Sequence, residues 1–318
     1  MSTGELTYQR ILLTGGAGFI GSHLAERLLA ERNEVLIVDD LSNGRREWVP
    51  DGSEFVEGDL TEPSTVKDVI DGDLEYVFHL AARKSVDDDR PRKQFEENTV
   101  MTHTILSRMK EVGVSNLVYT SSSTVYGEAP VPTPEDYAPL EPISVYGASK
   151  LADEGLLSVY AHSHGFSVWN VRFANVVGPR LRGAVIPDFI EKLGDDPDTL
   201  TILGDGRQEK SYMHVEDCID AMVRVVETTP KPMATYNLGT RTTTPVTRIA
   251  DIVSDVMGVE PTYEYTGGKR GWTGDVRKMQ LSIAKLSALG WTPSFESDRA
   301  VRRATEGLVR EIGSAIST

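Results

Sequence analysis

The sequence predicts an α/β protein, with a doubly wound parallel sheet followed by a smaller C-terminal α+β lobe. Short apolar runs alternate with longer amphipathic runs through the first half of the chain. A glycine-rich turn follows the first apolar run, and the second half is less regular and rich in proline and glycine. Alternation on this scale is typical of strand–helix–strand units that build one parallel sheet.

Six apolar runs are the expected strands, and amphipathic runs are the expected helices. The expected strands are 10–14, 34–38, 54–57, 76–80, 116–120 and 167–172. The expected helices are 19–31, 63–71, 92–112 and 145–163, with weaker patterns near 185–194, 214–227, 246–257 and 297–312. We therefore expect a first domain over 8–172 and a smaller lobe over 173–318, with a segment at about 205–240 returning to the first sheet.

Composition and charge exclude several classes of protein. The net charge of −15 over 318 residues disfavours nucleic acids and anionic membranes as partners. No run approaches 18 apolar residues and the N-terminus lacks a signal-peptide pattern, so we expect a cytoplasmic protein. A single cysteine, Cys218, excludes a disulfide framework and a cysteine-based metal site, and the six histidines lack ligand spacing.

The basic residues comprise 22 arginines and only 11 lysines. An acidic, lysine-poor surface suggests the hypothesis of a salt-rich cytoplasm, and the alternative is an ordinary acidic enzyme. Full activity maintained for days without added salt would contradict the salt hypothesis.

The first expected strand ends in a glycine turn that opens a helix. Gly15, Gly18 and Gly21 are spaced three residues apart between 10–14 and the amphipathic run that follows. This context is that of a dinucleotide-binding turn, in which glycines let a pyrophosphate approach the backbone and the helix N-terminus binds its charge. A purely structural glycine loop is the alternative.

Two aspartates follow the second expected strand. Asp39 and Asp40 lie 18 and 19 residues after Gly21, where an acidic side chain grips the ribose hydroxyls of NAD. Its charge repels the additional phosphate of NADP, although Arg45 and Arg46 lie close enough to weaken that preference. We therefore expect NAD as the cofactor and a Rossmann domain over 8–172.

Tyr146 and Lys150 lie four residues apart on the helix expected over 145–163, so both project from one face. A free phenol has a pKa near 10, and lowering it by about 3 units requires roughly 4 kcal/mol of stabilisation of the phenolate. One ammonium about 4 Å away supplies roughly that amount at an effective dielectric constant near 20. The pair predicts a tyrosine that accepts a proton from a hydroxyl. A packed ring beside a solvated amine is the alternative.

Seven short motifs, in this order, resemble those of the extended short-chain dehydrogenases/reductases. They are TGGAGFIGS (14–22), VDDLSNG (38–44), GDL (58–60), HLAARKSV (79–86), SSSTVYG (121–127), YGASK (146–150) and RFANVVGPR (172–180). Within this group the chain most resembles the UDP-glucose (UDP-galactose) 4-epimerases of the compact archaeal kind. The segments 202–221 and 271–276 fit the same pattern, so the resemblance covers nearly the whole chain.

The resemblance implies roles for individual residues. Tyr146 is the implied acid/base, Lys150 holds the ribose hydroxyls and lowers the pKa of the tyrosine, and Ser122 bonds to the reacting oxygen of the substrate. The cofactor contacts implied besides these and the residues above are Phe19, Ile20, Asn43, Gly44, Asp59, Leu60, Leu80, Ala81, Ala82, Lys84, Asn98 and Phe173. The further substrate contacts implied are Lys84, Ser123, Asn175, Val185, Lys210 and Arg270.

Two positions depart from the family pattern. Lys210 stands where the family often has arginine, so a phosphate contact there is a point charge without a bidentate fork. Arg270 lies five residues before Asp275, farther than in well-known bacterial epimerases.

The implied activity is 4-epimerisation of a UDP-sugar by transient oxidation at C4 with firmly held NAD, in a homodimer formed through the helices 92–112 and 145–163. A dehydratase, decarboxylase or reductase on the same fold is the alternative among enzymes. Dehydratases of the family resemble Thr-Asp-Glu at positions where this chain has Ser122-Ser123-Thr124. A non-catalytic NAD-binding sensor is the alternative of another class. The sequence leaves open which sugar is bound.

Overall fold

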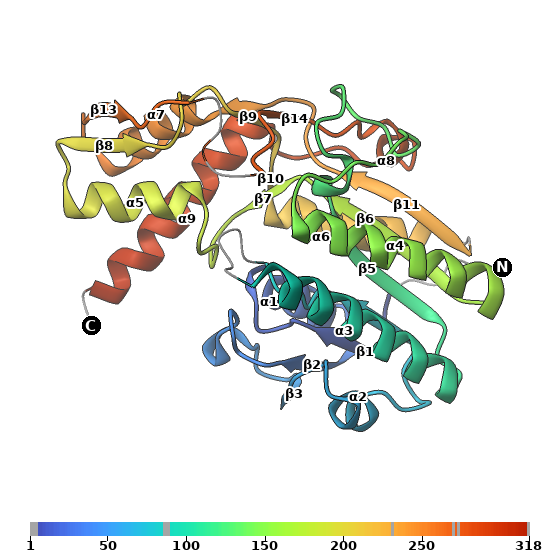
Figure 1. Cartoon of the computed structure of the whole chain (residues 1–318). Coiled ribbons are helices and arrows are strands. Elements are labelled where there is room, and N and C mark those ends of the chain that lie inside the picture. Colours follow the sequence, from blue (N-terminus) through green and yellow to red (C-terminus); the bar gives the residue numbers. More distant parts are fainter. Residues whose placement is uncertain (1–5, 85–89, 230–231, 269–270, 272–273, 317–318) are drawn as a thin grey trace. The chain divides into compact units, whose positions relative to one another are not determined.

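A seven-stranded sheet combines six strands from the first 173 residues with one strand from residues 233–238 (Figure 1). The computed structural model describes residues 6–84, 90–229, 232–268, 271 and 274–316. The strand order is β11, β6, β5, β4, β1, β2, β3. These strands are β1 (Arg10–Thr14), β2 (Glu34–Asp39), β3 (Glu54–Glu57), β4 (Tyr76–His79), β5 (Asn116–Ser122), β6 (Ser167–Phe173) and β11 (Met233–Leu238).

The order β3–β2–β1–β4–β5–β6 is that of a doubly wound nucleotide-binding sheet. The pairs β1–β2, β2–β3, β1–β4 and β4–β5 are all parallel. The chain reverses its direction of winding between β1 and β4, whose last residues, Thr14 and His79, lie opposite each other. Ligands of such sheets bind outside the carboxyl ends of the strands at this switch point.

Helices cover the sheet. They are α1 (Phe19–Ala30), α2 (Pro63–Val69), α3 (Pro91–Val112) and α4 (Val145–His164). The apolar sides of α2, α3 and α4 bury one face of the sheet, with Ile105 and Leu157 among their core residues. The helices α3 and α4 pack against each other (Figure 1). This packing fixes α4, the helix that carries Tyr146 and Lys150, relative to the strand ends.

The chain divides into two compact units. The first contains the chain up to Tyr126, Ala138–Arg172 and Ile219–Tyr236, and the second contains Gly127–Tyr137, Phe173–Cys218 and the chain from Asn237 onward. Three small sheets belong to the second unit: β7 (Asn175–Val177) with β10 (Tyr212–His214), β9 (Glu209–Lys210) with β12 (Thr244–Pro245) and β14 (Lys278–Met279), and β8 (Thr199–Ile202) with β13 (Thr262–Tyr265). The later helices are α5 (Val185–Asp195), α6 (Val215–Thr228), α7 (Val246–Met257), α8 (Ala284–Ser287) and α9 (Ser297–Ile316).

The predicted doubly wound α/β fold is confirmed, and every predicted element boundary except the end of α9 lies within two residues of the observed one. Strand β5 extends two residues beyond the predicted end at 120. Ser122 is therefore the last residue of the strand, whereas the predicted range placed it after the strand. Two 3-10 turns, η1 (Arg46–Trp48) and η2 (Ser123–Tyr126), were not expected. Among the described residues, no helix has the length and apolar character needed to cross a membrane.

Candidate active site

The turn between β1 and α1 brings backbone segments unusually close together. Gly15 has a φ of +68°, and a Cβ there would lie 2.8 Å from the amide nitrogen of Ala81. A Cβ at Gly21 would lie 2.2 Å from the carbonyl oxygen of Gly15, so only glycine lets α1 start this close to the turn. Gly18 is the N-cap of α1, and no side chain caps that first turn. A side-chain-free helix N-terminus fits the pyrophosphate of a dinucleotide.

Asp39 ties this turn to the loop after β2. Its two carboxylate oxygens accept hydrogen bonds from the amides of Ala17 (3.0 Å) and Leu41 (2.9 Å). Burial raises the pKa of the Asp39 carboxyl, although both amides oppose this. A Cβ at Gly44 would lie 2.8 Å from Asp39 Oδ1, so the loop folds back tightly over the carboxylate.

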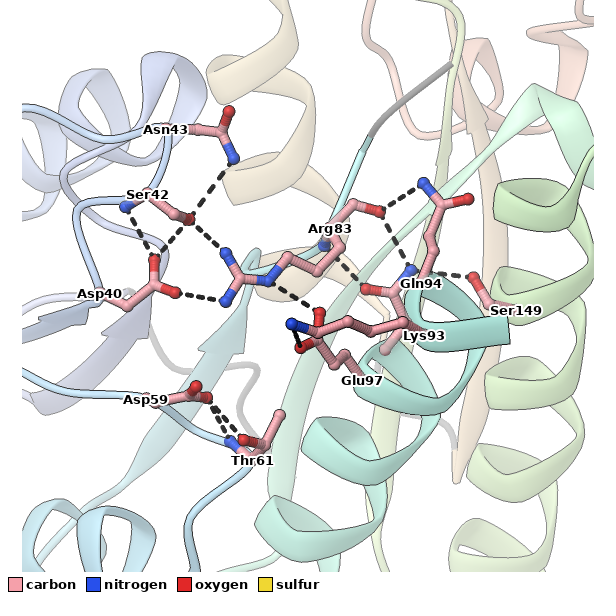
Figure 2. A network of polar contacts seen from close by, with 11 residues as sticks. Asp40, Ser42, Asn43, Asp59, Thr61, Arg83, Lys93, Gln94, Glu97 and Ser149 are labelled. Atoms are coloured by element: carbon pink, nitrogen blue, oxygen red, sulfur yellow. Dashed lines mark hydrogen bonds and ion pairs between the residues drawn. The ribbon is translucent and has the colours of Figure 1, made fainter. Parts of the chain in front are cut away.

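Asp40 is held by its own loop and by Arg83, which lies in the loop after β4 (Figure 2). Its Oδ1 accepts from the amide (3.0 Å) and hydroxyl (2.6 Å) of Ser42, and its Oδ2 lies 2.7 Å from Arg83 Nη2. Burial opposes the charge, yet these bonds hold the pKa of Asp40 below its ordinary value. Asp40, the second of the two predicted acids, is therefore an anion paired with Arg83. The sequence did not single out Arg83.

Arg45 and Arg46, which were expected to weaken the preference for NAD, stack on aromatic rings. The guanidinium of Arg45 lies 5.2 Å from the ring centre of Trp48, and that of Arg46 lies 4.4 Å from that of Phe55. Cation–π contacts at such distances are favourable. The guanidinium groups of Arg45 and Arg46 thus face the rings of Trp48 and Phe55.

The first turns of α4 pack directly against the turn that follows β5. The hydroxyl of Ser144 caps the helix by accepting from the Gly147 amide at 3.1 Å. A Cβ at Gly147 would lie 2.7 Å from the carbonyl oxygen of Thr124, so the helix can approach η2 this closely only with glycine there. Tyr146 precedes this contact on α4, and Ser122 precedes η2 at the end of β5. Backbone packing thereby brings the segments of both predicted residues together.

Lys150 lies inside the protein, between two tyrosines. Only 2% of Lys150 is exposed, and its Nζ lies 4.5 Å from the ring centre of Tyr119 and 5.8 Å from that of Tyr146. Burial lowers the pKa of Lys150 to about 8, and the nearby acids Asp153 and Glu154 oppose this. Asp153 is itself buried and accepts a 2.6 Å hydrogen bond from the hydroxyl of Tyr119. Burial raises its pKa to about 6.

The expected effect of Lys150 on Tyr146 requires a correction. Burial and the negative charge of Asp153 raise the pKa of Tyr146 above its ordinary value in the protein alone. The ammonium of Lys150 lies nearer to the ring of Tyr119, and the charge of Asp153 opposes its positive charge. Lys150 therefore does not lower the pKa of Tyr146 by itself. A basic Tyr146 therefore requires a second positive charge in the site.

A buried polar chain fixes the loop after β4. Thr14 Oγ1 accepts from the amides of Leu80 (3.1 Å) and Ala81 (3.2 Å) and lies 2.8 Å from His79 Nδ1. The other ring nitrogen of His79 lies 3.2 Å from Thr102 Oγ1. Burial and Lys150 lower the pKa of His79 to about 3, so this histidine is neutral and serves the structure of the strand ends.

The other residues predicted to bind the cofactor belong to the first unit or to its boundary. Asn98 is buried, and its side chain bonds to the backbone of Arg83 and to Ser149, so it supports the loop after β4. Asp59 Oδ1 accepts from the amide and hydroxyl of Thr61. The remaining ones open α1, end a strand or lie in a loop after one, and are Phe19, Ile20, Asn43, Gly44, Leu60, Leu80, Ala81, Ala82, Lys84 and Phe173.

The residues predicted to bind the sugar nucleotide beyond the strand ends belong to the second unit. Asn175 opens β7 and Val185 opens α5. The ammonium of Lys210 lies 2.5 Å from the buried carboxylate of Asp275, so its charge already has a counterion. The predicted contact at Arg270 lies outside the described residues.

A buried ion pair, not foreseen in the sequence, joins α4 to the sheet. Arg172 Nε and Nη2 donate to the two carboxylate oxygens of Glu154 at 2.9 and 2.6 Å. Arg172 Nη1 donates to the hydroxyl of Tyr126, and Ser121 Oγ donates to Glu154 Oε1, both at 2.6 Å. Burial opposes the charge of Arg172, but its hydrogen bonds and ion pair with Glu154 raise its pKa. The pair fixes α4 against β5, η2 and β6.

A family model described as the NAD dependent epimerase/dehydratase family matches residues 11–239. The chain belongs to this family. Its cofactor is NAD, and it is an enzyme. The UDP-glucose 4-epimerase of Mycolicibacterium smegmatis is 33% identical over 93% of this chain and 97% of its own length.

Solved structures of epimerases are similar to this chain over most of its length. One of a UDP-galactose 4-epimerase is 41% identical with a TM-score of 0.87, covering 95% of this chain and 99% of its own. That of the Thermus thermophilus UDP-glucose 4-epimerase in complex with NAD is 33% identical with a TM-score of 0.84, covering 94% and 98%. A UDP-N-acetylglucosamine 4-epimerase and a dTDP-glucose 4,6-dehydratase are also similar. The family and the cofactor are therefore shown, and the substrate is open.

Proposed function

We propose that the protein is a nucleotide-sugar 4-epimerase that interconverts UDP-galactose and UDP-glucose with NAD retained through each turnover. The observation that carries this proposal is the placement of Tyr146 and Lys150 on the first turns of α4, packed against the turn that follows Ser122. Relatives named UDP-glucose 4-epimerase, which match over most of their length, support the choice of substrate.

The bound NAD supplies reversible hydride acceptance at C4 of the sugar. Tyr146 takes the proton of the C4 hydroxyl and later returns it, and Ser122 donates a hydrogen bond to the same oxygen. The buried ammonium of Lys150 stabilises the phenolate, together with the positive nicotinamide ring. The 4-keto sugar turns in the site between the two hydride transfers, so the configuration at C4 is inverted.

Dehydration is a weaker candidate. Elimination of the C6 hydroxyl requires a proton donor and a base beside the sugar. The residues after Ser122 are Ser123 and Thr124, neither of which has a carboxyl group. Decarboxylation and reduction need no such acid pair, so the experiment must separate these from epimerisation.

The test uses UDP-glucose that carries deuterium at C4, incubated with the purified protein without added NAD. We expect UDP-galactose that retains deuterium at C4, as seen by NMR, because the hydride leaves and returns within one site. A reductase that exchanges its cofactor would lose the label, and a decarboxylase would yield a pentose from UDP-glucuronate. NAD binding without turnover of any UDP-, dTDP- or GDP-sugar would support the sensor alternative.

Asp153→Asn should move the pH profile of kcat/KM to lower pH. The charge of Asp153 raises the pKa of both Tyr146 and Lys150. Without that charge, Tyr146 becomes a base at lower pH and Lys150 loses its proton at lower pH, so both limbs move in the same direction. We expect a shift of roughly one pH unit, measured between about pH 5 and 10. Asparagine keeps an acceptor for the hydroxyl of Tyr119.

Asp68→Asn is the matched control, because it makes the same change of charge at an exposed position on α2. Its profile should coincide with that of the wild type. An unmoved profile for Asp153→Asn, or limbs that move in opposite directions, would contradict the electrostatic account.

We also propose that the enzyme is a homodimer formed through α3 and α4. The exposed apolar side chains Phe95 and Val100 on α3 and Val159 on α4 are available for such a contact. Light scattering should give the mass of two chains for the wild type and of one chain for Val100→Asp with Val159→Asp. A monomeric wild type would refute this proposal.

A further inference from the structure

Arg83 links segments that follow two different strands of the sheet. Arg83 lies in the loop after β4, and its guanidinium reaches the loop after β2 (Figure 2). There its Nη2 lies 2.7 Å from Asp40 Oδ2, and its Nη1 donates to Ser42 Oγ at 2.5 Å. Its Nε donates to Glu97 of α3 at 3.2 Å. In the sheet, β1 lies between β2 and β4, so this side chain spans the strand end where the glycine turn begins.

The backbone of Arg83 is held firmly. Its amide donates to Asn98 Oδ1 at 2.7 Å, and its carbonyl oxygen accepts from Asn98 Nδ2 and Gln94 Nε2, both at 3.2 Å. Gln94 and Asn98 are buried side chains of α3. Asn98 also donates to Ser149 of α4, next to Lys150. The backbone of Arg83 is thus held by α3, which is bonded through Asn98 to α4, the helix that carries Tyr146 and Lys150.

The loop that Arg83 reaches is tied to the glycine turn at its two ends, where the Ala17 amide donates to Asp39 at 3.0 Å and the Arg45 amide donates to the Ala17 carbonyl oxygen at 2.9 Å. Among the described contacts of Asp40, Ser42 and Asn43, all side-chain bonds are local except those to Arg83. Four residues of this loop, Asp39, Asp40, Asn43 and Gly44, were predicted to contact the cofactor. Arg83 therefore fixes the position of the loop that would cover the adenosine end of NAD.

We propose that Arg83 is a clasp that closes the adenosine end of the cofactor site and sets how slowly NAD leaves. The three partners of the guanidinium, Asp40, Ser42 and Glu97, occupy its Nη2, Nη1 and Nε, so the side chain is committed to holding the loop. It is a positioning residue and takes no part in the chemistry. The inference rests on the proposed function only in that epimerisation requires NAD to be retained between turnovers.

The test is the exchange of bound NAD for radiolabelled NAD in the holoenzyme, without any nucleotide sugar. We expect Arg83→Gln to exchange about 10-fold faster than the wild type, because glutamine cannot span both segments. Arg83→Lys should be intermediate, since one ammonium can pair with Asp40 but cannot form the fork. The NAD concentration for half-maximal turnover should rise in Arg83→Gln while the KM for the sugar nucleotide is unchanged.

A double-mutant cycle tests whether Glu97 acts through Arg83. Adding Glu97→Gln to Arg83→Gln should not accelerate exchange further, because the contact between the two side chains is already lost. The control is Arg92→Gln on α3, whose guanidinium pairs with Glu96 at an exposed position, and its exchange rate should equal that of the wild type. Unchanged exchange in Arg83→Gln, additive effects of the two substitutions, or a wild type that releases NAD at once would overturn the proposal. The readout is cofactor exchange, so failure of the epimerase assay alone leaves the clasp standing.

Discussion

Tyr146→Phe should lower kcat by at least about 100-fold, the lower end of the range for loss of an acid/base group. The substitution keeps the ring, which Lys150 faces at 5.8 Å, and removes only the hydroxyl. The remaining site can still hold NAD and the sugar nucleotide, so binding should persist while proton transfer from the C4 hydroxyl fails. The measurement is the rate of UDP-galactose conversion at saturating substrate, with NAD content determined in the same sample.

Tyr160→Phe provides the matched control. Tyr160 lies on the same helix, is buried, and loses a single hydrogen bond to Ser107 when its hydroxyl is removed. Its turnover should stay within a few-fold of the wild type. If Tyr146→Phe retained wild-type turnover, Tyr146 would not be the base and the proposed mechanism would be wrong.

Tyr146 is half-buried, and its surroundings explain why the proposed mechanism gives this tyrosine help from a positive charge. The protein alone raises the pKa of Tyr146, because the half-buried phenol is partly desolvated and Asp153 adds a negative charge nearby. Lys150 counters this charge without reversing its effect. In the proposed mechanism the positive nicotinamide ring would supply the missing positive charge, so Tyr146 would act as a base only in the holoenzyme.

The sequence predicted those parts of the site that depend on local spacing. The glycine turn depends on where β1 ends, and the pair Tyr146 and Lys150 depends on one turn of a helix. The alternation of apolar runs predicted the positions of both the strand and the helix. Asp153 was within reach of the same reasoning, since a residue three positions after Lys150 shares its helix face. It was missed because a buried aspartate has no sequence pattern of its own.

Long-range contacts set the remaining features, and spacing gives no information about them. Arg83 meets Asp40 from across a strand, and Lys210 meets Asp275 from 65 positions away. The family resemblance implies a substrate contact at Lys210, and the structure pairs this ammonium with the buried carboxylate of Asp275. Pairings of this kind follow from the order of strands and the return of the chain, which the apolar periodicity does not specify.

Arg172→Met should lower the free energy of unfolding by about 3–5 kcal/mol, the range for removing one partner of a buried ion pair. The substitution leaves Glu154 charged inside the protein, with Ser121 as its remaining hydrogen-bond donor. The expected loss is large because Arg172 and Glu154 are each at most 6% exposed and share two hydrogen bonds. Urea unfolding followed by tryptophan fluorescence, to which Trp169 on the same strand contributes, measures the change.

The double variant Arg172→Met with Glu154→Leu separates two causes of the lost stability. One is the loss of the ion pair itself, and the other is the unpaired charge that the single substitution leaves buried. Replacing both charges by apolar side chains removes the uncompensated carboxylate, so most of the lost stability should return. Turnover should nevertheless remain below that of the wild type, because the fork that fixes α4 against β5 and β6 is gone and Tyr146 is positioned less firmly. Arg92→Met, which breaks an exposed pair, should leave the unfolding curve unchanged. A single variant as stable as the wild type would contradict this account, and a double variant with full stability and full turnover would limit the pair to a role in folding.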